Sequence, residues 1–320
     1  MPVAIIGLGL IGGSLALRLR AAGVEVWAHD LSAETLQAAE VHEIRPYAEL
    51  EPMLTSLPDG ALVVIATPLQ QAVALMPVLA SHTSDQVTVT DVVSVKAAMV
   101  DAARDAGLAH RFVGAHPMAG TAESGFGAAS ADLLLEATWV ITLEGDTDID
   151  RWLQVCDLAL TSGGRVVPTD SEWHDHAAAW ISHLPHVLAE ILAANVEPHS
   201  LTGALAAGSY RDATRVAGTR TELVTAMLHG NRRMLTEALE SFLDQLEQAT
   251  LAVRDGDVTD LVRRGHDNRE RWQARRDGLA PTQHRTIDVR DDDAPAQLVE
   301  VGASGGFIVS HDHDLLTALI

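Results

Sequence analysis

The sequence predicts an α/β fold with an N-terminal doubly wound parallel sheet, an all-α domain and a short C-terminal extension. Three observations carry this prediction. Short apolar runs alternate with helical stretches over residues 1–170, long helical stretches rich in Ala, Leu and Val fill residues 171–280, and β-rich runs return over residues 281–320. A chain of 320 residues has room for two domains and a tail, at about 100–200 residues per domain.

The first region opens with a strand, a helix and a strand. Val3–Ile6 is expected as a buried strand, Gly13–Ala22 as a helix that stops at Gly23, and Val24–His29 as the next strand. The later runs are apolar on both faces, as strands of a parallel sheet covered by helices must be. We expect further strands at Ala61–Ala66, Val87–Val92, Phe112–Ala115, Thr138–Leu143 and Arg165–Val167, and a helix at Arg151–Thr161.

The second region carries Ala, Leu and Val at helical spacing and shows no strand pattern. Its expected helices are Asp175–Asn195, Thr202–Ala206, Glu222–Arg254 and Val258–Arg276. Long apolar helices with few aromatic residues often bury one face against another chain, so we expect a homodimer formed through this domain.

The tail has a mixed pattern. Strands are expected at Arg285–Val289 and Phe307–Ser310, and the stretch 293–298 weakly resembles the start of an ACT-type regulatory module. Because about 35–40 residues are few for an independent fold, an extension packed on the helices is an equally good interpretation.

Composition excludes several classes of function. The net charge of -22 argues against binding to nucleic acids or to anionic membranes, both of which need a basic face. Cys156 is the single cysteine, which fits a reducing cytoplasm. The N-terminus reads as a strand without a basic leader, and no apolar run reaches the roughly 18–20 residues of a membrane span.

A glycine-rich loop follows the first strand. Gly7, Gly9 and Gly12 fit the pattern G-x-G-x-x-G between a buried strand and a helix, which is the context that dinucleotide binding requires. Gly7 allows a tight turn, Gly9 lets the backbone approach a pyrophosphate, and Gly12 lets the helix pack on the strand. Leu10 and Ile11 stand at the helix start, where free N–H groups face phosphates.

Asp30 ends the second strand, 18 residues after Gly12. A carboxylate there accepts hydrogen bonds from the ribose hydroxyls of NAD and repels the 2′-phosphate of NADP. Leu31 and Ser32 follow it instead of an arginine, so we expect NAD. Thr67 and Pro68, after another strand, are further candidate cofactor contacts, while a flavin or a non-catalytic nucleotide sensor remains the alternative on this evidence.

Two polar segments follow expected strands at the edge of the sheet where ligands bind. In the first, Ser94 is placed to touch the nicotinamide or a substrate hydroxyl, and Lys96 is either functional or paired with Asp91. In the second, His116 precedes Pro117. A histidine titrates near neutrality, so it can take the proton from an alcohol as hydride leaves carbon.

Two more segments lie in the helical region. His183 and His186 share a helix face, but no third ligand stands at a matching spacing, so we expect no metal. Their expected role is to line the site or to make structural hydrogen bonds. Arg215 offers a guanidinium to an anionic substrate, whereas Arg211 better suits a surface ion pair with Asp212.

Together these segments resemble the prephenate/arogenate dehydrogenase family of tyrosine biosynthesis. The matching pieces occur in the family's order within about residues 1–255, and they are Gly7–Ser14, Thr90–Lys96, His116–Gly125, Ser182–His186 and Arg211–Ala217. The resemblance implies a Rossmann domain followed by a helical dimerisation domain. It also implies NAD-dependent oxidation of the C4 hydroxyl of a cyclohexadienyl substrate, with loss of the ring carboxylate as CO₂.

The resemblance also implies roles for individual residues. His116 would bind the C4 hydroxyl and help remove its proton, Ser94 would orient that hydroxyl and the nicotinamide, and Arg215 would hold a substrate carboxylate. The expected lining of the substrate pocket consists of Thr121, His183, His186 and Gly208.

Two positions depart from the family pattern. Ala122 stands where many members have Glu, with Glu123 displaced by one, and Val224 stands where many have Trp. Both affect the substrate pocket and leave the choice between prephenate and arogenate open. Prephenate is the expected substrate, and arogenate is the alternative.

Two other classes of protein remain as alternatives. A β-hydroxyacid-type dehydrogenase usually relies on a lysine in its helical domain, and this chain has no lysine after Lys96. A non-catalytic dinucleotide-sensing regulator would have no need of His116, Ser94 and Arg215 on separate segments.

Overall fold

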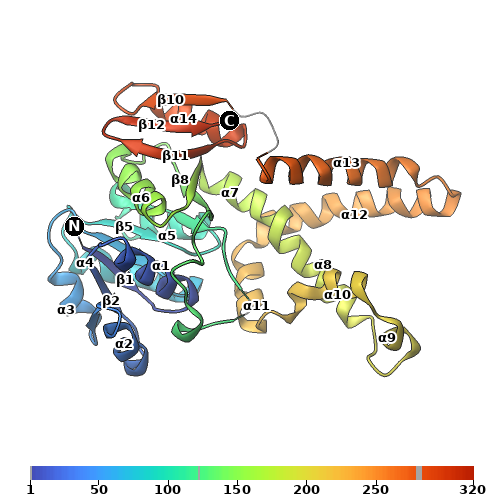
Figure 1. The fold of residues 1–320 in the computed structure, drawn as a ribbon, viewed down its shortest axis with the longest axis horizontal. Coiled ribbons are helices and arrows are strands. Elements are labelled where there is room, and N and C mark those ends of the chain that lie inside the picture. The colour runs from blue at the N-terminus through green and yellow to red at the C-terminus, as the bar shows by residue number, and fades with distance from the viewer. Residues whose placement is uncertain (1, 122, 279–282) are drawn as a thin grey trace.

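The computed structural model describes residues 2–121, 123–278 and 283–320, in which two six-stranded sheets lie beside a helical arm (Figure 1). The two long helices at the end of the arm run antiparallel and extend away from the sheets. The expected domain boundary at residues 280 and 281, like Ala122, lies outside the described residues.

The first sheet is fully parallel, with strand order β3-β2-β1-β4-β5-β6. Its strands are β1 Val3–Ile6, β2 Val26–His29, β3 Arg45–Tyr47, β4 Leu62–Ile65, β5 Thr88–Asp91 and β6 Phe112–Val113. The connecting helices are α1 Leu10–Ala21, α2 Ala33–Glu40, α3 Leu50–Thr55, α4 Leu69–His82 and α5 Ala97–Asp105, with a 3₁₀ turn at Ala109–Arg111. The strand order runs outward in both directions from β1, which confirms the doubly wound sheet.

β1 is apolar throughout because its side chains alternate between two faces that are both buried. Val3 and Ile5 point into one hydrophobic core, and Ala4 and Ile6 point into the core on the opposite face. Helices cover both faces of the strand, so every position along it is buried.

The second sheet is mixed and has the order β10-β12-β11-β9-β8-β7. It combines β7 Ala115–Pro117, β8 Thr138–Thr142 and β9 Arg165–Thr169 with three strands of the tail: β10 His284–Asp288, β11 Phe307–Asp312 and β12 Leu315–Leu319. Its helices are α6 Ile149–Thr161 and α14 Ala294–Ala303, and a 3₁₀ turn spans Phe126–Ala128. The prediction that the strands near residues 138 and 165 continue the first sheet was therefore wrong.

The expected strand Phe112–Ala115 splits at Gly114 between the two sheets. Gly114 donates its N–H to Thr142 Oγ1 at 3.1 Å, and a Cβ at this position would lie 2.9 Å from the same oxygen. This close approach lets the chain leave β6 and enter β7 of the second sheet. The strand-to-strand turn brings His116 to the junction of the two sheets.

The tail joins the second sheet. Ile308 in β11 pairs antiparallel with Val166 in β9, and β12 pairs with β10 and β11. The interpretation of the tail as an extension packed on the helical domain was wrong, because backbone pairing to β9 decides its place. The ACT-like start at residues 293–298 falls on α14 and stays a prediction.

The helical arm begins with one long helix that contains a π turn. Its parts are α7 Ser171–Ala178, the π segment Ala179–His183 and α8 Leu184–Ala194. The remaining helices are α9 Leu201–Leu205, α10 Gly208–Thr214, a 3₁₀ turn at Arg215–Gly218, α11 Thr221–Gly230, α12 Arg232–Asp255 and α13 Thr259–Arg276.

Two details of the arm differ from the prediction. The helix α10 was not predicted, and the single helix expected over Glu222–Arg254 is broken at Asn231. A Cβ at Gly230 would lie 2.5 Å from Leu69 Cδ2, so the chain is pressed against α4 here. Asn231 then turns its amide into the site instead of continuing α11.

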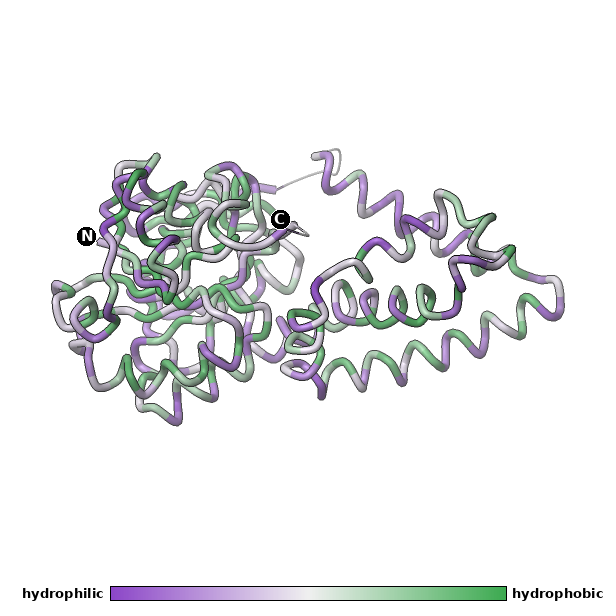
Figure 2. Tube along the Cα trace, turned by 90° about the horizontal axis from the view of Figure 1, so that it is seen from below, coloured by the Kyte–Doolittle hydropathy of each residue, from purple (hydrophilic) through white to green (hydrophobic). Residues whose placement is uncertain are grey.

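Many apolar side chains of the arm remain exposed, and Figure 2 shows hydrophobic stretches along helices that lie away from the sheets. The large exposed ones include Ile191, Leu192, Leu201, Leu205, Leu243, Leu246, Val253 and Val262. The continuous helix Ser171–Ala194 meets the length and composition test for a membrane span, contrary to our sequence reading, with 28% of its most apolar window buried. The start of this helix is engaged in a buried polar network.

Candidate active site

The glycine-rich loop has the geometry that a bound dinucleotide requires. Gly7 has φ of +96°, and a Cβ there would lie 2.8 Å from the carbonyl oxygen of Ala66. A Cβ at Gly12 would lie 2.1 Å from the carbonyl oxygen of Gly7. At Gly9 a Cβ would meet no described atom within 4 Å, so the space above this residue is open to a ligand.

The start of α1 leaves donors free beside that space. The helix begins at Leu10, and Gly9 at its N-cap has no side chain to accept the first N–H groups. The N–H groups of Leu10 and Ile11 belong to the first turn, where no intrahelical acceptor exists. Such a helix start favours a phosphate group by its free donors and by its dipole.

Asp30 holds the glycine-rich loop through two backbone hydrogen bonds. Its Oδ2 accepts the N–H of Leu8 at 2.8 Å, and its Oδ1 accepts the N–H of Ser32 at 2.8 Å. Each carboxylate oxygen can accept a further hydrogen bond. Asp30 can therefore fix the loop and bind a ribose hydroxyl together.

Thr67 completes this part of the site. Its methyl carbon lies 3.0 Å from the Cβ position of Gly7, and its buried Oγ1 has no hydrogen-bond partner among the described residues. A buried hydroxyl without a partner is costly unless a ligand satisfies it. Pro68 is exposed and precedes α4. The residues of this end of the sheet thus fit a dinucleotide.

A buried ion pair positions His116. Lys96 and Asp91 are completely buried and paired; Lys96 Nζ donates to the carbonyl oxygen of Ala115 at 2.8 Å, and Asp91 Oδ1 accepts the N–H of Ala115 at 3.2 Å. Burial raises the pKa of Asp91 and lowers the pKa of Lys96, while their mutual attraction opposes both shifts. The pair clamps both backbone groups of the residue before His116, so Lys96 has the structural partner that we considered. Ser94, partly exposed, lies between them in sequence after β5.

His116 contacts a histidine that sequence reasoning missed. Its Nδ1 lies 2.9 Å from Nε2 of His174 in α7, and His174 Nδ1 lies 2.7 Å from Asp175 Oδ1. Burial lowers the pKa of His116 well below 6.5, and the charges of His174, Lys96 and His183 lower it further. His116 is therefore neutral at neutral pH, as a proton acceptor must be.

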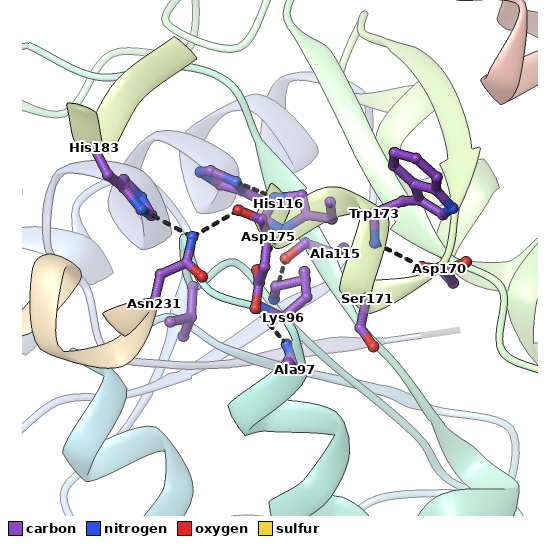
Figure 3. A network of polar contacts seen from close by, with 12 residues as sticks. Lys96, Ala97, Ala115, His116, Asp170, Ser171, Trp173, Asp175, His183 and Asn231 are labelled. Atoms are coloured by element: carbon purple, nitrogen blue, oxygen red, sulfur yellow. Dashed lines mark hydrogen bonds and ion pairs between the residues drawn. The ribbon is translucent and has the colours of Figure 1, made fainter. Parts of the chain in front are cut away.

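Asn231 links the start of α12 to the long first helix of the arm. Its Nδ2 donates to the carbonyl oxygen of Asp175 at 2.7 Å and contacts His183 Nδ1 at 3.0 Å (Figure 3). Because the carbonyl can only accept, the amide nitrogen must face both groups, so His183 Nδ1 accepts and its proton stands on Nε2. Burial lowers the pKa of His183 to about 4, which keeps the ring neutral.

Arg215 and His186 lie near each other. Burial is the main cause that lowers the pKa of His186, and the charge of Arg215 lowers it further. The buried Nδ1 of His186 has no hydrogen-bond partner in the described parts of the chain. Arg215 is exposed in the 3₁₀ turn after α10, while Arg211 pairs with Asp212 at 3.3 Å, as the sequence suggested.

The structure does not connect the last two predicted pocket residues to this network. Thr121 is exposed, and its Oγ1 accepts the N–H of Glu123 at 3.2 Å. Gly208 begins α10, and a Cβ there would meet no described atom within 4 Å. Val224, the second departure from the family pattern, is buried in α11.

Comparison with known proteins decides the family. The nucleotide-binding domain of prephenate dehydrogenase matches residues 15–168, and the dimerization domain of prephenate dehydrogenase matches residues 170–264. The chain is 31% identical to prephenate dehydrogenase of Bacillus subtilis over 90% of this chain and 81% of the relative. The chain belongs to the prephenate dehydrogenase family.

Solved structures of the prephenate dehydrogenase family agree with the fold. A Corynebacterium glutamicum protein provisionally assigned as a prephenate dehydrogenase is 37% identical, with a TM-score of 0.86 over 95% of this chain and 97% of that one. Prephenate dehydrogenase of A. aeolicus, solved with hydroxyphenyl propionate and NAD+, is 26% identical, with a TM-score of 0.77 over 85% and 97% of the two chains. This member of the family is an NAD-dependent dehydrogenase.

Proposed function

We propose that this enzyme oxidises prephenate and releases CO₂ to give 4-hydroxyphenylpyruvate. The observation that carries the proposal is His116, which is neutral, clamped through Ala115 and located at the junction of the cofactor-binding sheet and the helical arm. NAD, when bound, supplies the acceptor for the hydride from C4. His116 takes the proton of the C4 hydroxyl, and the bond from the ring to the carboxylate breaks so that the ring becomes aromatic.

Arg215 holds a substrate carboxylate in this proposal. A protein with a net charge of -22 repels anions in general, so a placed guanidinium has to provide the attraction. Arg215 is exposed and lies close enough to His186 to lower the pKa of that ring. His186, beside Arg215, adds a buried ring nitrogen that has no hydrogen-bond partner among the described residues.

Ser94 and His183 orient the reacting ring. Ser94 follows β5 at the end of the sheet where ligands bind, and we assign it to the C4 hydroxyl and the nicotinamide. His183 presents an Nε2–H donor because Asn231 occupies its other nitrogen. Thr121 and Gly208 are assigned to the rim of the pocket by motif match.

The active form is proposed to be a cytoplasmic homodimer joined through the helical arm. The exposed apolar side chains of α8, α9 and α12 provide the surface, and the family's dimerization domain covers these helices. Light scattering at micromolar concentration tests the dimer, and a monomer at all concentrations contradicts it.

Steady-state assays of the purified chain test the substrate. Prephenate and arogenate are each supplied with NAD or NADP, with and without tyrosine. A higher kcat/KM with prephenate and NAD supports the proposal, and a higher value with arogenate would transfer the same mechanism to the amino acid. Binding of NAD without turnover of either substrate would favour the nucleotide-sensing alternative.

A further inference from the structure

Asp175 and His174 form a buried chain that ends on the proposed base. We propose that this pair is a positioning relay that fixes His116 in one tautomer, with its free lone pair on Nε2, and stabilises the ring once it is protonated. The proposal depends on the proposed function, because it needs His116 to act as the base. Neither His174 nor Asp175 belongs to the motifs by which the sequence resembles the family.

The hydrogen bonds of the chain determine each tautomer in turn. The carboxylate of Asp175 can only accept, so Nδ1 of His174 must donate across the 2.7 Å contact. Nε2 of neutral His174 is then an acceptor, and Nδ1 of His116 must donate to it across 2.9 Å. The lone pair of neutral His116 is left on Nε2, on the side away from His174.

Asp175 is well suited to anchor such a chain. Its Oδ1 also accepts the N–H of Lys96 at 2.8 Å, and its Oδ2 accepts the N–H of Ala97 at 2.9 Å (Figure 3). Burial raises the pKa of Asp175, but these hydrogen bonds and that of His174 hold it below its ordinary value. The carboxylate is thus ionised and immobile, with a side chain only 3% exposed.

The charge that appears on His116 during the reaction needs this support. When the substrate proton moves to Nε2, His116 becomes a cation whose surroundings include Lys96, His183 and His174. Lys96 repels it, although Asp91 offsets much of that charge. The hydrogen bond from Nδ1 to His174, which is polarised by Asp175, is strengthened when the ring is charged. No second proton moves, and Asp175 stays ionised.

The tautomer of the wild-type enzyme provides the most direct test. Long-range ¹⁵N–¹³C NMR spectra of histidine-labelled protein show which nitrogen of each ring carries the proton, and the signal of His116 is assigned by its loss in His116→Asn. We expect the proton of neutral His116 on Nδ1. A proton on Nε2 would overturn the relay without any need for a variant to fold.

Kinetics of two variants and a matched control give the second test. In His174→Phe the loss of one hydrogen bond to a developing charge should lower kcat by about 10–100-fold. Asp175→Asn should lower kcat at least as much and move the proton of His116 to Nε2, because an amide can donate to His174. His176→Phe changes a half-buried histidine of the same helix that makes no described hydrogen bond, and it should leave kcat unchanged.

A normal kcat in His174→Phe with an inactive His116→Asn would refute the relay alone, while an active His116→Asn would refute the proposed base.

Discussion

The cofactor end and the catalytic end of this site are built in different ways. Leu8 and Asp30, which close the phosphate loop, are 22 residues apart, and the β1-α1-β2 unit contains both. The bonds that hold the catalytic end join residues 79 apart at Lys96 and Asp175, and 48 apart at His183 and Asn231. The phosphate loop forms within one local unit, and only Ala66 and Thr67 after β4 are added to it from farther along the chain, whereas the catalytic end exists only after the sheets and the arm have packed together.

Removing the base should produce the largest effect and leave the cofactor end intact. His116→Asn is expected to lower kcat by about 10²–10⁴-fold, because the proposed acceptor of the hydroxyl proton is lost. NAD affinity, measured by isothermal titration, should stay unchanged. A kcat near the wild-type value would contradict the assigned role.

Arg215, which is proposed to hold a substrate carboxylate, should show a smaller effect when it is replaced, and this effect should appear in KM. Arg215→Ala is expected to raise the KM for the substrate by roughly 10–100-fold, the value of a charge-assisted hydrogen bond of about 1.5–3 kcal/mol. Arg211→Ala is the matched control, since Arg211 is an exposed neighbour paired with Asp212. Equal KM values for the two variants would show that another cation holds the carboxylate.

Two alanine substitutions separate the packing role of the phosphate loop from its role in binding NAD. Gly12→Ala places a Cβ 2.1 Å from a backbone oxygen, so it should lower the free energy of unfolding by about 1–3 kcal/mol as well as weaken NAD binding. Gly9→Ala meets open space at φ of -69° and should weaken NAD binding at unchanged Tm. Thermal unfolding and NAD titration of both variants measure this, and an equal loss of Tm would contradict the distinction.

Asp30→Ala should change cofactor choice more than it changes catalysis. Loss of the carboxylate removes the repulsion of a 2′-phosphate, so the ratio of kcat/KM for NAD over NADP should fall. Affinity for NAD should also fall, because the N–H of Leu8 loses its acceptor. Continued strict rejection of NADP would show that another residue discriminates between the cofactors.

Acid should lower the free energy of unfolding, because His183 is held in its neutral form in the folded chain. Its pKa of about 4 in the folded chain lies below the ordinary 6.5, so the unfolded chain binds more protons between these values. Stability should therefore fall as the pH drops from 6.5 to 4, by up to about 3 kcal/mol. Urea unfolding of His183→Gln should show a shallower loss over this window, and identical slopes would contradict the assignment.

Sequence reasoning reached the site residues that lie in local motifs. The glycine loop, His116 and the histidine pair each stand beside an element that could be predicted from periodicity. His174 was missed because its role comes from a contact with a strand 58 residues earlier. A polar His-Asp pair at the start of an apolar helix was the one available signal.

The tail shows the same limit at the level of the fold. Two of its strands were predicted from β-rich runs, yet β12 and the pairing partner of β11 were not. Alternation of apolar residues reveals that a strand has a buried face, but it does not reveal which sheet edge offers free N–H and C=O groups.

By itself the sequence determined the parallel sheet, the dinucleotide loop and the family, because these depend on short-range spacing and on motifs. Only the tertiary structure decided the second sheet, the ion pair that clamps Ala115, and the tautomers of His116 and His183. Those features depend on which buried donors and acceptors meet across long stretches of chain. Their energies depend on the burial of these groups and on the geometry of their hydrogen bonds, and neither can be inferred from the local sequence.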